Sequence, residues 1–312
     1  MRFEIKAYTG KPITEPGIYS GVPISVYHGP DLCDGPSISS SGLRTIFSQS
    51  AAHYWAFSPY NPKRFEQTET KALLLGQAAH HALLGEEGFW KRYVQRPEEL
   101  NDKAWNSNRN DCKAWLDQQA LAGKTVLTAD QVAQIRGMAA GLSQDPLVQH
   151  GILNGLIEHT IVLRDSETGV WIKIRPDAIP NDSGDFGDLK TTTSVDDESL
   201  QKTINSYGYH QQGALVARGA REVLGAFESF CDVFVETKPP FCARTITLKE
   251  ADLALGDKQN QAAIRVFARG MKTGSWPGPG GTRSDGAYLG LKPWAIDQIN
   301  YRLSEMKREE AA

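Results

Sequence analysis

The sequence predicts an α/β protein with a mixed central β-sheet flanked by helices. Apolar and polar residues alternate from Val170 to Asp177, and this period of two is typical of a half-buried strand. Residues from about Thr70 to Leu84 are apolar on nearly every side of a helix, so we expect that helix to be buried. With 312 residues, of which 40% are apolar and 23% charged, the chain can build the core of one large α/β unit.

The remaining elements follow in order along a single expected domain that spans residues 1–312. Residues 1–36, rich in Gly and Pro, are expected to form an N-terminal extension of short strands and turns. Residues 37–248 form the expected central part, and 249–312 a helical C-terminal region. Ser39 offers an N-cap for the first helix. Other expected elements are helices over 70–84, 128–142, 196–220, 249–272 and 294–309, strands over 156–164, 228–237 and 244–248, and a Gly/Pro-rich loop over 274–290.

The stretch from Val170 to Thr193 reads as two strands joined by a tight turn at 181–184. Asp177 ends the first strand, whereas Asp188 and Lys190 lie on one face of the second, because alternate side chains on a strand share a face. If the hairpin closes around this turn, two carboxylates and one ammonium group converge. Such oxygen ligands select Mg²⁺ or Mn²⁺. A neighbouring lysine can orient a metal-bound water and stabilise negative charge on a phosphate.

A plainer interpretation is that the two aspartates flank an ordinary turn and that Lys190 pairs with one of them on the surface. An isolated Asp-x-Lys tripeptide favours that interpretation because such tripeptides are common. The wider context, Pro-Asp at a strand end, a short turn, then Gly-Asp-Leu-Lys-Thr-Thr, favours the metal site instead.

This context resembles the core of the PD-(D/E)XK nucleases, in the version of the exodeoxyribonuclease VIII (RecE) type of phage and prophage recombination exonuclease. The resemblance continues in Leu75-Gly-Gln-Ala-Ala-His80-His81, where His80 takes the position of the active-site histidine. It continues again in Tyr207-Gly-Tyr209-His210-Gln-Gln212, where Gln212 takes the glutamine position. Segments 38–43 and 51–54 resemble the opening helix of the family. The pattern departs at Val216, where related nucleases often have a tyrosine, and Tyr207 or Tyr209 could replace it.

The resemblance implies a restriction-endonuclease-like fold with residues 37–248 as the catalytic core, and a hydrolase that depends on Mg²⁺, for which Mn²⁺ can substitute. Catalytic roles fall to Asp177, Asp188, Lys190 and Gln212, and metal binding to His80, Asp177, Asp188 and the backbone carbonyl of Leu189. The implied activity is 5′→3′ digestion of double-stranded DNA ends, which leaves a 3′ single strand for a RecT-like annealing protein. Relatives form rings, so a ring-shaped homo-oligomer is a further expectation.

Several residues keep two interpretations. His80 on an apolar helix can be a core residue or a metal ligand, and His81 points about 100° away from it. Glu158 could add a carboxylate or stay solvated at a strand edge. Ser39 and Ser41, with Arg44 one turn on, could seat a phosphate at a helix N-terminus or simply cap that helix.

Composition and charge exclude several classes of protein. A net charge of −3 argues against a generally cationic surface, although a local basic groove can still bind phosphates. The four cysteines are scattered without a Cys-x-x-Cys pair, as in a reduced cytoplasmic protein without an iron–sulfur cluster. No apolar run approaches the ~20 residues of a membrane helix, and the N-terminus lacks a signal-peptide pattern. We therefore expect a cytoplasmic protein with no membrane partner.

Two alternatives to the exonuclease remain at this point. One is a structure-specific or single-strand nuclease of the same superfamily, which would have the same motif. The other is a catalytically silent DNA-binding or scaffold protein. Such a protein predicts a broken acidic pair or a missing lysine, whereas Asp177, Asp188 and Lys190 are all present.

Overall fold

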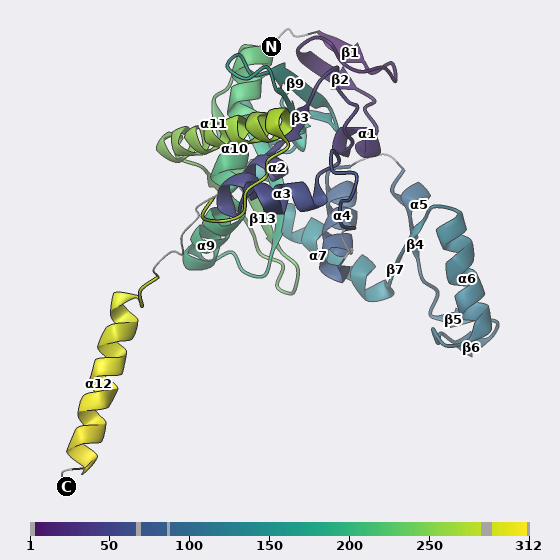
Figure 1. The fold of residues 1–312 in the computed structure, drawn as a ribbon. Helices are drawn as coiled ribbons and strands as arrows, with labels where there is room; N and C mark the ends of the chain where they lie inside the picture. The colour runs from purple at the N-terminus through teal and green to yellow at the C-terminus, as the bar shows by residue number, and fades with distance from the viewer. Residues whose placement is uncertain (1–3, 67–69, 86–87, 282–288, 311–312) are drawn as a thin grey trace. The chain divides into compact units, whose positions relative to one another are not determined.

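The structure is a computed structural model that describes residues 4–66, 70–85, 88–281 and 289–310 (Figure 1). The chain divides into two compact units, Met1–Trp276 and Pro277–Ala312. Part of the Gly/Pro-rich loop expected over 274–290 lies outside the described residues. In the ranges that are described, no helix is both long and apolar enough to cross a membrane.

The first unit contains a five-stranded mixed sheet, which confirms the predicted fold class. Its strand order is β1 (Ile5–Ala7), β2 (Gly17–Ser20), β9 (Thr160–Arg164), β10 (Trp171–Ile174) and β3 (Ser37–Ser39). Strand β10 runs antiparallel to β9 and parallel to β3. All four residues of β10 are buried, although their alternation predicted a half-buried strand. The N-terminal residues explain the difference, because Lys173 donates to the carbonyl of Gly29 and Trp171 to the carboxylate of Asp34.

A three-stranded ladder consists of β12 (Asp185–Thr192), β13 (Ser229–Glu236) and β14 (Ala243–Thr247). Strands β12 and β13 are parallel, and β14 runs antiparallel to β13. The expected hairpin between β10 and β12 is wrong, since these strands belong to different ladders. Between them the chain forms β11 (Ala178–Ile179), which pairs with β8 (Leu156–Ile157). Pro176 and Pro180 flank this short strand, and because proline lacks an N–H it cannot donate to a continuous ladder.

Helices cover both faces of β12 and β13. One face packs against α10 (Tyr209–Gly219), which also contacts α11 (Glu250–Thr273) and α2 (Ser40–Ser48). The other face contributes Leu189 and Val233 to a core shared with α4 (Lys71–Leu83) and α7 (Ala129–Leu142). Leu73 of α4 is exposed, so the expectation of a fully buried helix is wrong, because only one side of α4 meets that core.

The helical stretch expected over 196–220 is two helices, α9 (Asp197–Tyr207) and α10, which meet at Gly208. Gly208 has a φ of 65°, a left-handed conformation that glycine adopts without steric cost. A π-helical turn, η1 (Ala220–Leu224), continues α10. The break turns the start of α10 towards β12.

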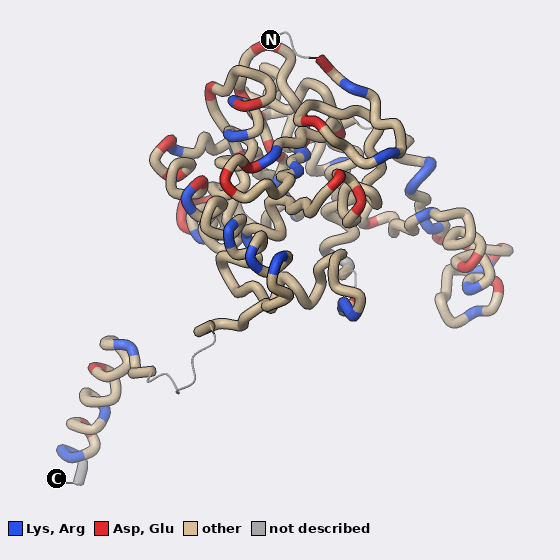
Figure 2. The backbone as a smooth tube through the Cα atoms, turned by 45° about the horizontal axis from the view of Figure 1, so that its top comes forward, with Lys and Arg blue, Asp and Glu red and all other residues tan. Residues whose placement is uncertain are grey.

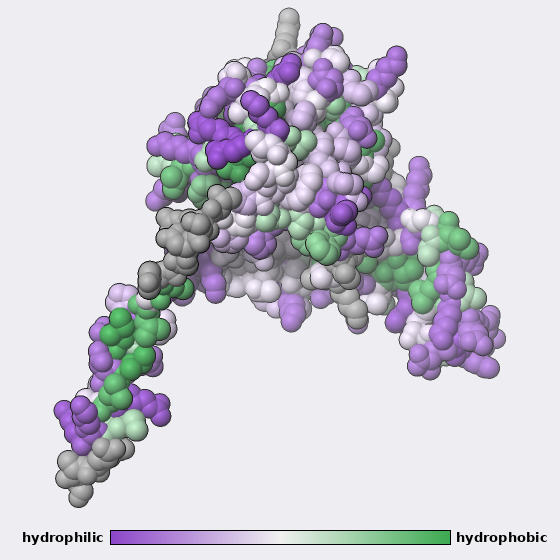
Figure 3. Space-filling model, in the orientation of Figure 1, coloured by the Kyte–Doolittle hydropathy of each residue, from purple (hydrophilic) through white to green (hydrophobic). Residues whose placement is uncertain are grey.

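The other described elements lie outside the central layers. They are α1 (Ile24–His28), α3 (Ala51–Phe57), α5 (Phe89–Arg92), β4 (Tyr93–Gln95), β5 (Glu99–Leu100), β6 (Lys103–Ala104), α6 (Asn110–Leu121), β7 (Thr125–Leu127) and α8 (Pro146–Gln149). Basic and acidic residues are interspersed over the first unit, so there is no continuous cationic coat in the described part (Figure 2). The second unit consists of α12 (Pro293–Glu310), along which exposed apolar side chains such as Trp294 and Leu303 gather (Figure 3).

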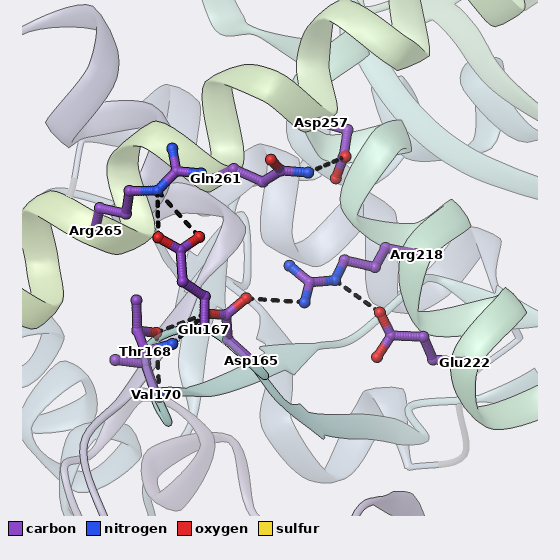
Figure 4. A network of polar contacts seen from close by, with 9 residues as sticks. All are labelled: Asp165, Glu167, Thr168, Val170, Arg218, Glu222, Asp257, Gln261 and Arg265. Atoms are coloured by element: carbon purple, nitrogen blue, oxygen red, sulfur yellow. Dashed lines mark hydrogen bonds and ion pairs between the residues drawn. The ribbon is translucent and has the colours of Figure 1, made fainter.

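A charged network joins the turn after β9 to α10 and α11 (Figure 4). Asp165 accepts hydrogen bonds from Thr168 and, at 2.9 Å, from Nη2 of Arg218. Glu167 accepts from Arg265 at 2.8 Å. These partners satisfy the hydrogen-bonding capacity of the buried Asp165 carboxylate. We therefore interpret the network as structural, since it connects the sheet to the helices that pack on it.

Candidate active site

Asp177 and Asp188 come together although no hairpin forms. The Oδ2 atom of Asp177 accepts a hydrogen bond from the backbone N–H of Leu189 at 2.6 Å. Strand β12 is the edge of its ladder and its other edge pairs with β13, so Asp177 lies against the open edge. Asp177 therefore lies beside Asp188, as the motif predicted. The two residues meet because the side chain of Asp177 is bound to the open edge of β12, and not because the chain forms a hairpin.

His80 contacts the other carboxylate oxygen of Asp177. Its Nε2 atom is 2.8 Å from Oδ1 of Asp177. The neighbouring His81 is only 3% exposed and packs against Phe89 and Tyr93, with Nδ1 3.1 Å from Nη1 of Arg92. Of the two histidines on α4, His80 is thus the one that reaches the candidate site, and its role as a metal ligand stays a prediction.

Lys190 and Gln212 hold the carboxylate of Asp188 between them. The ammonium group of Lys190 binds Oδ2 of Asp188, and the Nε2 atom of Gln212 donates to Oδ1 at 2.8 Å. Gln212 also accepts from Lys190 at 3.2 Å. One connected set of contacts therefore joins the predicted residues Asp177, Asp188, Lys190, Gln212 and His80. Their catalytic roles stay predictions.

Burial and mutual charge set the protonation of this set. Burial would raise the pKa of Asp177, but His80 and Lys190 hold that pKa below its ordinary value. The pKa of Asp188 is raised, first by burial and then by the charge of Asp177. Burial alone would lower the pKa of Lys190. The carboxylates of Asp188, Asp232 and Asp177 outweigh burial and raise this pKa, so the lysine is protonated and carries a positive charge.

The donor atoms fit a hard divalent cation. No group of three or more His, Cys, Asp or Glu side chains in the described ranges is arranged to hold an ion as it stands. Asp177 and Asp188 nevertheless supply neighbouring carboxylate groups, largely shielded from solvent, of the kind that Mg²⁺ and Mn²⁺ prefer. Their repulsion raises the pKa of Asp188, and a cation between them would relieve it. Binding would require Lys190 to give up its contact with Asp188.

The predicted phosphate seat lies close to this set. Ser39, Ser41 and Arg44 line a cavity of about 150 Å³ together with Gln212, and no carboxylate lines that cavity. Ser39 is the N-cap of α2 but makes no side-chain capping bond, and its hydroxyl lies 3.1 Å from that of Ser41. Arg44 donates from Nη1 to the carbonyl of Tyr207 at 2.6 Å. The absence of a side-chain capping bond therefore argues against the interpretation that Ser39 only caps α2.

The structure separates the residues whose roles the sequence left open. Tyr209 lies over Lys190, with 4.5 Å from Nζ to the ring centroid, whereas Tyr207 is 63% exposed. Tyr209 is therefore the tyrosine at the site. His210 turns away and lies 2.7 Å from the Oε1 atom of Gln259 on α11. Glu158 adopts a left-handed φ of 61° and lines a cavity of about 240 Å³ that also contacts His80 and Asp177.

Sequence reasoning missed Asp232. This residue is fully buried in β13 and lies directly opposite Asp188 in the parallel register. Burial raises its pKa to about 7, partly offset by the charge of Lys190. A signal was present, because an aspartate interrupts the apolar strand Phe-Cys-Asp-Val-Phe-Val, and charged residues are seldom fully buried unless they are paired.

Together, the mixed sheet, its flanking helices and the Asp-Asp-Lys set define a protein of the PD-(D/E)XK class. Residues 39–284 match the family described as "PDDEXK-like domain of unknown function (DUF3799)", and the protein belongs to this family. A crystal structure of a "putative exonuclease" from Eubacterium rectale superposes with a TM-score of 0.54 and 13% identity, over 88% of this chain and 94% of that one. At this identity the likeness concerns the fold. Among the curated proteins, no sequence matches the chain.

Proposed function

We propose that the protein is a metal-dependent deoxyribonuclease, and in particular a 5′→3′ exonuclease of the exodeoxyribonuclease VIII (RecE) type that acts on double-stranded DNA ends. The observation that carries the proposal is the juxtaposition of Asp177 and Asp188 at the edge of β12 with Lys190 bound to Asp188. Two buried carboxylates and a lysine on adjacent backbone segments suit phosphodiester hydrolysis better than they suit a protein core.

In this reaction a water molecule gives up a proton to the solvent as its oxygen attacks the phosphorus atom. The bond to the leaving oxygen breaks, and the leaving oxygen takes up a proton, so that one water is added across the P–O bond. Bound Mg²⁺ would supply a water of lowered pKa and neutralise phosphate charge. Asp177, Asp188, His80 and the carbonyl of Leu189 are the residues proposed to hold it. Lys190 donates its ammonium hydrogens to the phosphate oxygens as negative charge develops, and Gln212 fixes the position of Lys190.

The expected polarity is supported by the cavity at the start of α2. A terminal phosphate there would meet the N–H groups at the helix N-terminus, the hydroxyls of Ser39 and Ser41, and the guanidinium group of Arg44. Gln212 lines the same cavity, so a phosphate bound there lies close to the Lys190–Asp188 pair. This arrangement supports digestion that begins at a 5′-phosphorylated end.

Two further parts of the proposal rest on the resemblance alone: a RecT-like single-strand annealing protein as partner for the 3′ strand, and a ring-shaped homo-oligomer around the duplex. A third part, a cytoplasmic location, is supported by the scattered cysteines without a Cys-x-x-Cys pair. Copurification with such a partner and sedimentation of the purified protein would test the first two.

The deciding experiment uses linear duplex DNA labelled at either the 5′ or the 3′ end, with Mg²⁺ or with EDTA. We expect early release of the 5′ label as mononucleotides, persistence of the 3′ label on shortened strands, and no reaction in EDTA. A duplex with 5′-hydroxyl ends should react more slowly, and Arg44→Met should remove that difference. Cleavage of nicked or single-stranded DNA in preference to duplex ends would favour the structure-specific or single-strand nuclease. Binding of DNA without any cleavage would favour the catalytically silent DNA-binding protein.

A further inference from the structure

Asp232 is a buried carboxylate that no described residue stabilises by a hydrogen bond. It lies in the middle of β13 with no exposed surface, and neither Oδ1 nor Oδ2 has a hydrogen-bond partner within the described ranges. An unpaired buried carboxylate opposes folding strongly. Its presence therefore needs an explanation other than stability.

Two buried aspartates outside the candidate site, Asp145 and Asp165, show what a structural role looks like. Asp145 accepts hydrogen bonds from the backbone of Leu147 and Val148 and from Thr245. Asp165 accepts from Thr168 and Arg218 (Figure 4). Both carboxylates are thus satisfied by local partners. Asp232 lacks such partners and lies beside the candidate active site.

The sheet register places Asp232 on the same side as the catalytic set. Directly paired residues of two parallel strands point to the same face, so Asp232 shares the face of Asp188 and, two residues on, of Lys190. Phe230, two residues before Asp232, packs on this face against Gly213 of α10. Asp177 lies at the open edge of β12, whereas Asp232 lies on the strand at its paired edge.

Three carboxylates therefore follow one another across the site, in the order Asp177, Asp188, Asp232. A cation held by the first two would lie at the open edge. Lys190 lies two residues from Asp188 on the same face of β12, and Asp232 is paired with Asp188 in the register, so both carboxylates lie on the face of Lys190. Lys190 thus has two carboxylates within electrostatic reach, of which only Asp188 binds it directly.

We propose that Asp232 is a positioning residue that receives the ammonium group of Lys190 when a divalent cation binds Asp188. This inference rests on the metal-dependent function proposed above. A cation and an ammonium group on one carboxylate repel each other, so Asp188 cannot hold both well. Asp232 offers the displaced ammonium a second acceptor on the same face. Lys190 then stays in the site, clear of the cation and free to meet the phosphate.

The proposal predicts an energetic coupling between Asp232 and Lys190 that can be measured without DNA. Without Asp232, the ammonium group stays on Asp188 and competes with the cation. Asp232→Asn should therefore weaken Mn²⁺ binding about tenfold, or about 1.4 kcal/mol, as measured by the electron paramagnetic resonance of free Mn²⁺. In a Lys190→Gln background the same substitution should change the Mn²⁺ dissociation constant less than about twofold, since no ammonium group competes.

The outcomes separate the alternatives. Equal weakening in both backgrounds would mean that Asp232 binds the cation itself, and no weakening in either would mean that it acts on the fold alone; each overturns the proposal. Asp165→Asn serves as the matched control, because it removes a buried carboxylate with satisfied partners and should lower the melting temperature without changing Mn²⁺ binding. If Mn²⁺ binding survives Asp188→Ala unchanged, the metal site of the proposed function fails, and the role of Asp232 with it.

Discussion

His80 and Asp177 lie 2.8 Å apart, measured from Nε2 to Oδ1, although they come from α4 and from the segment before β11. This contact joins the helix layer on one face of the sheet to the edge of β12. The next residue, His81, is buried among aromatic side chains instead. Adjacent histidines on one helix therefore have different surroundings, which gives a matched pair of variants.

The first prediction concerns this pair. His80→Ala should weaken Mn²⁺ binding roughly tenfold and leave the melting temperature nearly unchanged, because a half-exposed imidazole beside a carboxylate tunes the metal site more than the core. His81→Ala should do the opposite and destabilise the fold by about 2 kcal/mol through loss of buried packing. Metal titration and thermal unfolding of both variants check this. An unchanged metal titration for His80→Ala would make His80 a core residue.

The second prediction concerns Lys190. Lys190→Ala should lower the Mg²⁺-dependent rate by roughly 10²- to 10³-fold, as for loss of a donor that stabilises a transition-state charge. The circular dichroism spectrum should stay native, because the apolar residues of β12 and β13 keep their packing. The exposed Lys202 of α9 provides the control, and Lys202→Ala should retain full activity. Full activity of Lys190→Ala would remove the proposed site.

The third prediction concerns the amide of Gln212, which bridges Asp188 and Lys190. Gln212→Met keeps the side-chain length but removes both hydrogen bonds, at 2.8 and 3.2 Å. Hydrogen bonds to charged groups contribute about 1.5–3 kcal/mol, so kcat should fall roughly ten- to hundredfold. Steady-state rates on a short 5′-phosphorylated duplex measure this, with the exposed Gln201 replaced by Ala as control. If kcat is unchanged, Gln212 only packs between α10 and the sheet.

The sequence could predict the contacts that short stretches of chain determine. The Pro-Asp and Asp-Leu-Lys segments lie close in sequence, and the predicted proximity of Asp177 to Asp188 is confirmed. The expected hairpin failed, because the pattern could not show that β11 would pair with β8. The helix over 249–272 was predicted correctly, since its apolar spacing is continuous.

Contacts that depend on distant pairing could not be predicted. Asp232 comes opposite Asp188 only through the register of two parallel strands, which no local pattern specifies. The choice between Tyr207 and Tyr209 depends on the left-handed turn at Gly208, which carries the second tyrosine towards Lys190. Neither contact could be predicted, because each joins Asp188 or Lys190 to a residue of a distant segment of the chain.

The last prediction concerns Lys173, a lysine of β10 that is buried under the N-terminal residues. Burial lowers its pKa to about 8, and its Nζ atom donates to the carbonyl of Gly29 at 3.0 Å. In the unfolded chain a lysine has a pKa of about 10.4. Between these two values the unfolded state binds more protons than the folded state, so the stability of the protein rises with pH. Below pH 8 the buried charge opposes folding by up to about 3 kcal/mol.

Urea unfolding of the wild type and of Lys173→Met at a series of pH values from about 7 to 10 measures this effect. The stability of the wild type relative to the variant should rise by up to about 3 kcal/mol across this window. The neighbouring thiol of Cys33 is present in both proteins, so its own titration cancels in the difference between their stabilities. A difference that stays flat with pH would show that Lys173 is charged to the same extent in both states.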